Sequence, residues 1–147
     1  MFKNILIPTD GSPLSRTAVK AGVALAAALG ARVTGFFAAP PATPIVYRAV
    51  LPVGYGTAPE HAKAIERTAD SYLEAIQDAA KAAGVPCSTV HVTSDFPADA
   101  ILAAAKKRKC DLIFMASHGR RGLRGIVLGS ETQKVLARAT VPVVVFR

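Results

Sequence analysis

Hydrophobic positions along the chain follow two alternating patterns. Short apolar runs, typical of strands buried on both faces, occur at residues 4–8, 32–39, 86–92, 111–115 and 141–146. Between them lie segments whose apolar side chains recur at near-helical spacing, at residues 13–29, 60–83, 97–105 and 130–138. Strands that alternate with helices predict an α/β fold, doubly wound, in which helices cover both faces of a parallel sheet.

Polar residues and prolines mark where the helices begin. Ser12 is a candidate N-cap with Pro13 at the first helical position, and Gly30 ends the same helix. Asp95, two residues before Pro97, predicts another helix start. Residues 40–59 are rich in proline and glycine and predict a loop between strand and helix.

The composition suits one globular domain that spans residues 1–147. Half of the chain is hydrophobic (51%), but no apolar run approaches the length of a membrane span. The first residues lack the features of a signal peptide, so we expect a cytoplasmic protein without membrane contact. Cys87 and Cys110 belong to no metal or disulfide pattern and are expected to be buried free thiols.

The formal net charge of +8 favours anionic partners. The lysine-rich run at 106–109 falls at a predicted helix end, where cations complement the helix dipole and face water. No aromatic side chains alternate with the basic ones, so nucleic acid is not the expected partner. Arg120, Arg121 and Arg124 differ because they lie in the loop that precedes a candidate anion site, where guanidinium groups can pair with phosphate.

That candidate site lies between the fourth strand and the last helix. Ala116-Ser117-His118-Gly119 leaves the strand, and Gly129-Ser130 opens the helix. Ser130 and Gln133 match a Ser-x-x-Gln capping box, so backbone N–H groups of residues 130–132 should cluster at the positive end of the helix dipole. Gly129 would let a phosphate approach the main chain. The alternative is an ordinary capped helix that binds nothing.

A second loop should meet the first. In open α/β sheets, ligands bind at the carboxyl ends of the strands where the strand order reverses, and Pro8-Thr9-Asp10-Gly11-Ser12 follows the first strand. Asp10 could accept hydrogen bonds from ribose hydroxyls or meet a metal through water. Equally, Asp10 could only hydrogen-bond its own Asp-Gly turn. We expect His118 to be a solvent-facing loop residue, and a contact with phosphate is the alternative.

Several other functions are excluded by missing motifs. The chain has no P-loop, no Gly-x-Gly-x-x-Gly and no Gly-x-Ser-x-Gly nucleophile elbow. His61, His91 and His118 are not spaced as metal ligands on one element, so no metal site is predicted. No catalytic residue is assigned either, because no convincing general base is present.

The last strand carries a proline, Pro142, which cannot donate to a sheet ladder and therefore indicates an edge position. An open edge of valines and phenylalanine favours aggregation unless it is paired. We therefore predict a homodimer that pairs through residues 141–146.

Four segments together resemble the universal stress protein family: residues 5–12 (Ile-Leu-Ile-Pro-Thr-Asp-Gly-Ser), 117–122 (Ser-His-Gly-Arg-Arg-Gly), 128–130 (Leu-Gly-Ser) and 141–145 (Val-Pro-Val-Val-Val). The resemblance spans the whole chain and implies a five-stranded parallel sheet of order 3-2-1-4-5 and a dimer. One class of the family binds ATP or related adenine nucleotides and carries Gly-x2-Gly-x9-Gly-Ser/Thr. Gly119, Gly129 and Ser130 fit this motif, whereas Ala116 stands in place of its first glycine.

The resemblance also implies a set of site residues. Asp10 would hold the ribose. The other contacts would be Pro8, Thr9 and Ala38 beside the adenine, Met115 along the pocket next to Ala116, and Gly119, Gly129, Ser130, Glu131 and Thr132 around the phosphates, with His118, Arg120 and Arg121 as further candidate phosphate contacts.

Three functions compete on this basis. The first is a dimeric stress-response sensor or regulator that binds ATP, ADP, AMP or cyclic AMP, with Mg²⁺ as an optional companion and at most slow ATP hydrolysis. The second is an interaction module that binds no nucleotide, for which Ala116 is the main evidence. The third is binding of nucleic acid or polyphosphate through the basic surface, which steep salt dependence would reveal.

Overall fold

A computed structural model of the chain describes residues 1–41, 58–119 and 128–147. Within these residues, five strands form one parallel sheet in the order β3-β2-β1-β4-β5, as the sequence resemblance implied. The strands are β1 (Asn4–Pro8), β2 (Arg32–Ala39), β3 (Cys87–Thr93), β4 (Leu112–Ala116) and β5 (Val143–Phe146).

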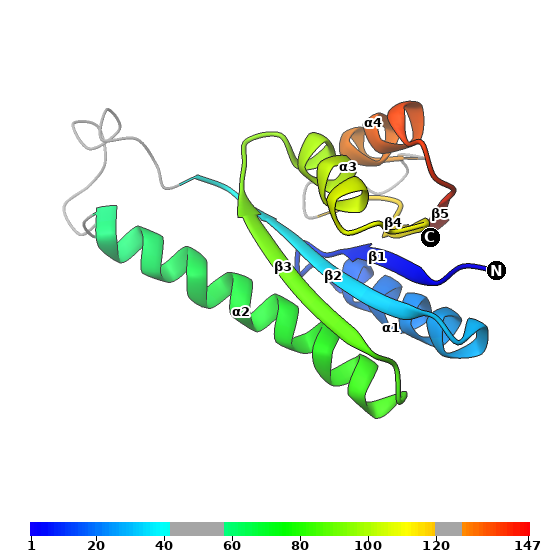
Figure 1. Ribbon diagram of the computed structural model, residues 1–147. Coiled ribbons are helices and arrows are strands. Elements are labelled where there is room, and N and C mark those ends of the chain that lie inside the picture. The colour runs from blue at the N-terminus through cyan, green and yellow to red at the C-terminus, as the bar shows by residue number, and fades with distance from the viewer. Residues whose placement is uncertain (42–57, 120–127) are drawn as a thin grey trace.

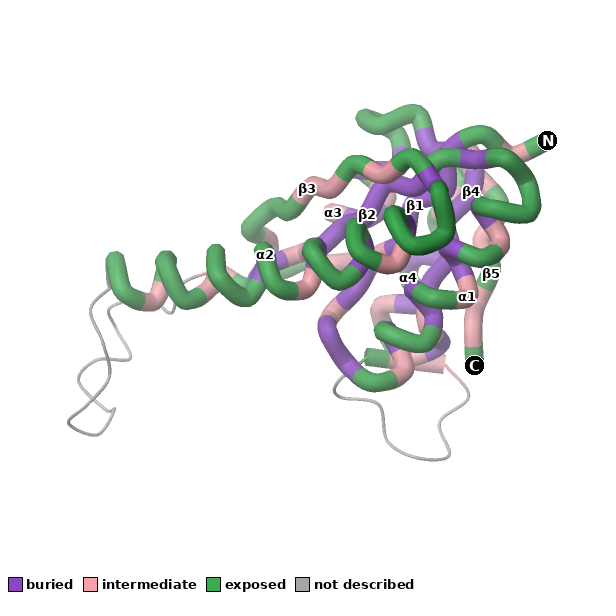
Figure 2. Tube along the Cα trace, turned by 90° about the horizontal axis from the view of Figure 1, so that it is seen from below, coloured by how far each residue is buried: buried purple, intermediate pink, exposed green. Residues whose placement is uncertain are grey.

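Helices cover both faces of the sheet (Figure 1). Helices α1 (Pro13–Leu29) and α2 (Ala58–Ala82) pack on one face, and α3 (Pro97–Lys107) and α4 (Ser130–Arg138) on the other. Successive side chains of β1 alternate between the two cores, with Ile5 and Ile7 against α1 and α2 and Leu6 against α3 and α4. The buried positions in Figure 2 therefore run through the central strands β1, β2 and β4, whereas the outer sides of the helices are exposed.

Local signals set the ends of α1 as predicted. The Ser12 hydroxyl accepts a hydrogen bond from Ser15 N at 3.2 Å, and Pro13 takes the first helical position. Gly30 ends the helix in the left-handed conformation, with φ at 63°.

Other boundaries differ from the prediction by one or two residues. Strand β5 begins at Val143 and not at residue 141, because Pro142 lacks an N–H and contributes only its carbonyl, which accepts from Ile113 N at 3.0 Å. The N-cap of α3 is Phe96 and not Asp95, and no side chain of its own segment caps it. The predicted loop at 40–59 lies largely outside the described residues.

The remaining predictions concern exposure. Cys110 is buried as expected, but Cys87 is only half-buried, because its edge strand β3 is covered on fewer sides. Lys106 and Lys107 end α3 with exposed side chains, as predicted. No helix within the described residues is long and apolar enough to cross a membrane.

Candidate functional site

The loops that follow β1 and β4 meet at the carboxyl edge of the sheet. These two strands are neighbours in the sheet. The helix that follows β1 packs on one face of the sheet and the helix that follows β4 packs on the other, so the strand order reverses between them. A Cβ placed on Gly119 would collide with Oδ2 of Asp10. The two residues that the sequence singled out in separate loops are therefore in direct contact.

Asp10 also has the turn role that the sequence left open. Its Oδ1 accepts a hydrogen bond from Ser12 N at 3.0 Å, which closes an Asx turn at the start of α1. Oδ2 points instead toward the loop after β4, where Gly119 lies. The carboxylate thus belongs to both loops.

Thr9 fixes the position of the first loop. This buried residue donates its backbone N–H to Phe36 O at 2.9 Å, and its hydroxyl shares a hydrogen bond of 2.9 Å with the Ser15 hydroxyl. The same hydroxyl accepts from Gly11 N at 3.2 Å. The hydroxyl and the N–H of Thr9 are therefore both engaged by the protein, so a ligand would meet its methyl group instead.

Ser117 holds both ends of the second loop, a role that the sequence did not reveal. Its N–H donates to Phe146 O at 2.7 Å, and its carbonyl accepts from Gly129 N at 2.7 Å. Its hydroxyl lies 3.2 Å from Nδ1 of His118, which is half-buried beside Ser117 and not solvent-facing as the sequence predicted. Its place directly after a buried strand was the only sequence signal. Arg120 and Arg121, the candidate phosphate contacts, and Arg124 lie outside the described residues.

The first turn of α4 corrects the predicted capping box. Gly129 is the N-cap, Ser130 is already helical, and the Gln133 amide donates to Leu128 O at 2.9 Å. A glutamine amide is a donor as well as an acceptor, and here it serves the carbonyl before the helix. The first intrahelical bond runs from Gln133 N to Gly129 O at 3.0 Å, so the N–H groups of residues 130–132 precede it at the positive helix end.

Two further contacts tie this helix start to the sheet. The Thr132 hydroxyl donates to Ala116 O at 3.1 Å, which fixes α4 against the end of β4. A Cβ on Gly129 would lie 3.1 Å from the backbone Cα of His118, closer than side chains normally approach. A glycine at 129 therefore allows the loop to close on the helix.

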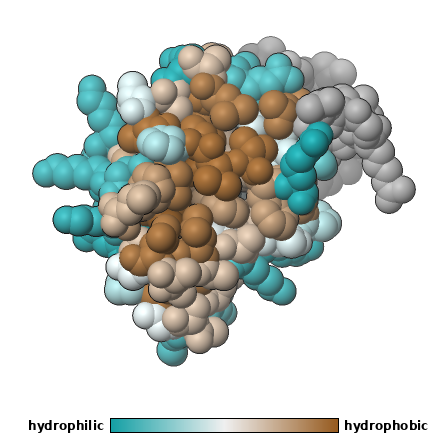
Figure 3. Space-filling model, turned by 90° about the vertical axis from the view of Figure 1, so that its right-hand side faces the viewer, coloured by the Kyte–Doolittle hydropathy of each residue, from teal (hydrophilic) through white to brown (hydrophobic). Residues whose placement is uncertain are grey.

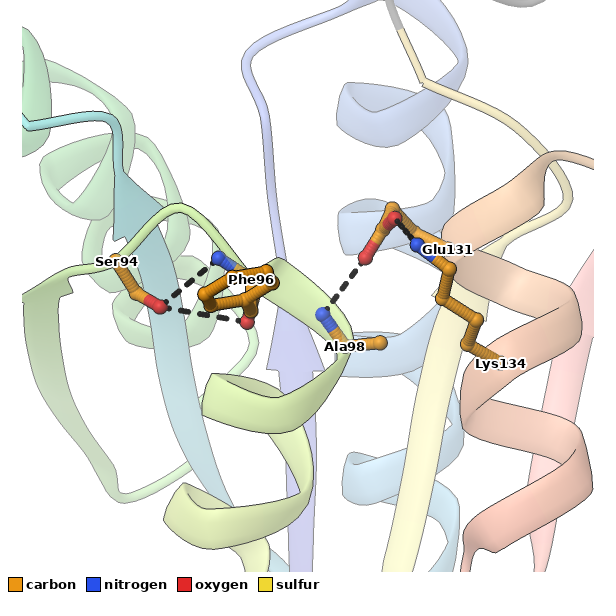
Figure 4. Close-up of polar contacts among 5 residues, drawn as sticks. All are labelled: Ser94, Phe96, Ala98, Glu131 and Lys134. Atoms are coloured by element: carbon orange, nitrogen blue, oxygen red, sulfur yellow. Dashed lines mark hydrogen bonds and ion pairs between the residues drawn. The ribbon is translucent and has the colours of Figure 1, made fainter.

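Glu131 turns toward α3 and away from its own helix end (Figure 4). Its Oε2 accepts from Ala98 N at 2.8 Å, and its Oε1 pairs with Lys134 Nζ at 2.7 Å. The carboxylate is thus the missing N-terminal cap of α3. Among the expected phosphate contacts, Glu131 could supply its backbone N–H more readily than its side chain.

The apolar candidates divide between the two faces of the sheet. Met115 is buried in the core beneath α3 and α4, and the half-buried Ala38 packs against the same core. Ala116, also half-buried, packs against the core beneath α1 and α2, because successive residues of a strand point to opposite faces. Pro8, at the end of β1, is half-buried.

Two cavities lined by described residues lie away from this edge. One lies between α2 and β3 with a volume of about 340 Å³, and the other lies between α3 and the connection from α4 to β5, at about 490 Å³. Within the described ranges, no three His, Cys, Asp or Glu side chains are grouped closely enough to hold a metal ion.

Comparison with known proteins gives one consistent family. The model of the universal stress protein family matches residues 1–147. A universal stress protein of Thermus aquaticus is 34% identical over 148 residues, which cover 100% of both chains. The sequence signature at the two loops and the strand order agree with this match.

Two solved structures share the fold. One is a universal stress protein in complex with cAMP, with a TM-score of 0.73 at 24% identity over 99% of this chain and 97% of that one. The other is the universal stress protein from Archaeoglobus fulgidus in complex with dAMP, with a TM-score of 0.64 at 17% identity over 100% and 98% of the two chains. From the family match along the whole chain and the Thermus aquaticus relative, we conclude that this chain belongs to the universal stress protein family.

Proposed function

We propose that this protein binds an adenine nucleotide at the carboxyl edge between β1 and β4, and that it acts as a dimeric sensor or regulator in a stress response. The contact between Asp10 and Gly119 carries the proposal, because it brings a carboxylate next to the loop that leads into α4. A ribose needs a hydrogen-bond acceptor, and phosphates need N–H donors, so both halves of a nucleotide have a matching group here.

The roles divide along the nucleotide. Asp10 accepts from the ribose hydroxyls, and the phosphates meet the N–H groups at the start of α4, beside Gly129 and Gly119. The adenine lies near Pro8, Thr9, Ala38 and Met115. Adenine specificity is supported by the family relatives that hold cAMP or dAMP.

The position of the Ala116 methyl group removes the main argument for a module that binds no nucleotide. The methyl group packs against the core on the α1 side, whereas α4 lies on the opposite face. Only the carbonyl of Ala116 is directed to α4, where Thr132 binds it. We therefore expect alanine to be tolerated at this position of the family motif.

Hydrolysis of ATP should be slow at most. A dedicated ATPase positions a water and usually a metal ion. The nearby carboxylates have other tasks, since Asp10 accepts from Ser12 N and Glu131 accepts from Ala98 N. Release of phosphate from ATP, measured over hours, should therefore stay far below enzymatic turnover rates.

The test is a calorimetric titration with ATP, ADP, AMP and cAMP, each with and without Mg²⁺, together with a native mass spectrum of the freshly purified protein. Asp10→Asn keeps an acceptor for Ser12 N but removes the charge, and should weaken binding on the order of tenfold. The matched control is Asp78→Asn on the exposed side of α2, which should bind normally.

Absence of binding of every nucleotide at millimolar concentration would contradict the proposal and favour the interaction module. Equal affinities of the two variants would contradict the role of Asp10. Binding that disappears steeply with added salt, without nucleotide preference, would instead favour the basic surface as the site.

A further inference from the structure

The larger of the two cavities is lined by none of the residues proposed to contact the nucleotide. It lies between α3 and the connection from α4 to β5. Its lining residues Lys109 and Cys110 directly precede β4, and Thr140 and Val141 precede β5, so one end of the cavity lies at the amino edge of the sheet, whereas Asp99 lies in the first turn of α3. At about 490 Å³ it falls within the usual size of small-molecule sites.

The inner wall of this cavity is apolar. Leu102 from α3, Ile113 from β4 and Val141 from the last connection line it, together with the buried Cys110. On α3, lining residues recur at 99, 102, 103, 105 and 106, which is one side of the helix rising by about 10 Å. The cavity is therefore an elongated groove suited to an aliphatic chain.

Its rim is positively charged. Three cations reach it from three different segments: Lys106 from α3, Lys109 from the turn after it, and Arg138 from the end of α4. The acidic lining residue Asp99 already pairs with Arg138 at 2.6 Å. The two lysine ammonium groups therefore leave a net positive charge beside an apolar wall.

Lys109 occupies a backbone position that would suit glycine better. Among the described residues it is the only non-glycine with positive φ, at 54°. Such a conformation is unfavourable for a residue with a side chain and often accompanies function. A glycine here would relieve the backbone strain. The presence of a lysine at this position therefore needs a separate explanation.

Capping of α3 does not supply that explanation. The last carbonyls of the helix already accept backbone N–H groups: Arg108 N bonds Ala104 O at 2.9 Å, Lys109 N bonds Lys106 O at 3.1 Å, and Cys110 N bonds Ala105 O at 2.8 Å. These three carbonyls are thus satisfied without any lysine ammonium group.

We propose that this cavity binds a small aliphatic carboxylate. The hydrocarbon chain lies along the apolar wall formed by Leu102, Ile113 and Val141, and the carboxylate meets the ammonium groups of Lys106 and Lys109. A single anionic head on an apolar tail matches both the wall and the rim. This site is separate from the nucleotide site, so either can fail without the other.

The test uses octanoate as the probe, titrated into the full-length protein by calorimetry. We expect saturable binding with one octanoate per chain, and weaker binding of the uncharged octanol on the order of tenfold. Lys109→Gln should weaken octanoate binding by a similar factor. Lys107→Gln is the matched control, because Lys107 is exposed and lies in the same run but does not line the cavity.

A second substitution separates strain from binding. Lys109→Gly should raise the melting temperature by about 2 to 4 °C, because glycine accepts the left-handed conformation, and should weaken octanoate binding as Lys109→Gln does. On the exposed wall residue Ala103, Ala103→Glu should weaken binding, whereas the uncharged Ala103→Gln should do so much less.

Several results would overturn the proposal. These are no saturable octanoate binding to the folded protein, equal weakening by Lys107→Gln and Lys109→Gln, full affinity in Lys109→Gly, or equal affinities of the two Ala103 variants. Val141 also belongs to the segment proposed to pair in a dimer, so the oligomeric state of each variant is checked by light scattering.

Discussion

Single side chains decide how the two site loops fit together. At Gly119, Oδ2 of Asp10 occupies the space that a Cβ would need. At Gly129, the His118 backbone lies 3.1 Å from the position that a Cβ would take. Neither glycine is among the described residues with positive φ, so alanine at 119 or 129 is opposed by contact and not by backbone strain. The two glycines thus have different neighbours, one a side chain and one a backbone.

This difference predicts a non-additive pair of substitutions. Gly119→Ala should destabilise the protein by about 0.5 to 1.5 kcal/mol, because the new methyl group displaces the Asp10 carboxylate from its hydrogen bond with Ser12 N. In an Asp10→Ala background the same substitution should cost little, since the carboxylate is gone. Chemical denaturation of the four proteins measures the coupling.

Gly129→Ala provides the control for this cycle. Its cost should be the same in the Asp10→Ala background as in the unaltered protein, because its neighbour is backbone that Asp10→Ala leaves in place. Equal costs of Gly119→Ala in both backgrounds would refute the contact with Asp10.

Asp111 gives the stability a dependence on pH. Burial disfavours its charge, but the backbone N–H groups of Asn4 and Lys3 bind the carboxylate at 3.0 and 2.8 Å, and the net effect holds its pKa below the usual 3.8. A carboxyl group with a lowered pKa stabilises the fold at pH values above its unfolded pKa. That contribution is lost as the pH falls below 3.8 and through the folded pKa.

Asp111→Asn should therefore lower the melting temperature at pH 7 by about 2 to 4 °C, because an amide accepts these hydrogen bonds less strongly. The gap to the unaltered protein should narrow as the pH falls below 3.8 and through the lowered folded pKa of Asp111. Thermal unfolding between pH 7 and pH 2 measures this difference in melting temperature. The exposed Asp78→Asn is the control and should melt like the unaltered protein. A gap that is constant with pH would contradict the assignment.

At the scale of elements, α3 depends on α4 for its N-terminal cap. Phe96 at the N-cap position makes no side-chain cap bond, and Ala98 N is bound by the Glu131 carboxylate from the other helix. The negative charge also lies at the positive end of the α3 dipole. The two helices on this face are thus joined at the edge where the nucleotide site is proposed.

Glu131→Ala should lower the stability by about 1 kcal/mol, the usual cost of a lost cap. Glu131→Gln keeps a hydrogen-bond acceptor for Ala98 N and should therefore lower the stability by less than Glu131→Ala does. Lys134→Ala removes only the exposed partner of Glu131 and should change stability by roughly 0.5 kcal/mol or less. Equal stability of the Ala and Gln variants, measured by denaturant titration, would refute the cap.

At the scale of the whole molecule, the sheet has two open edges of different character. Figure 3 looks onto the side of the molecule where β5 lies, and hydrophobic side chains gather there. Val144 on β5 and Val92 on β3 are each 38% exposed, and Leu136 on the neighbouring helix is 41% exposed. The apolar surroundings of β5 support the proposed dimer through residues 141–146.

Val144→Lys should therefore convert the proposed dimer to a monomer, because a charge on the edge proposed to pair would be buried without a partner. Val92→Lys makes the same change at an equally exposed position on the opposite edge and should leave the dimer intact. Light scattering coupled to size exclusion distinguishes them. Loss of the dimer in Val92→Lys alone would place the interface on β3 instead.

Predictions from the sequence were accurate where the cause is local. The cap at Ser12, the stop at Gly30 and the exposed lysines at the end of α3 depend on neighbouring residues, and the structure confirms them. The capping box at Ser130 was wrong because the Gln133 amide serves Leu128 O. Several acceptors lie within reach of such a side chain, and sequence spacing does not rank them.

The alternation of strands and helices, the family signature and the two loops that carry the candidate chemistry can all be recognised in the amino-acid sequence. Hydrophobic period, capping residues and glycines act within a few residues, so they can be read along the chain. The contact between Asp10 and Gly119, the cap that Glu131 provides for α3 and the place of Lys109 beside a cavity are visible in the folded protein alone. Those facts depend on which distant segments pack together, and packing is settled by the shape of the whole core.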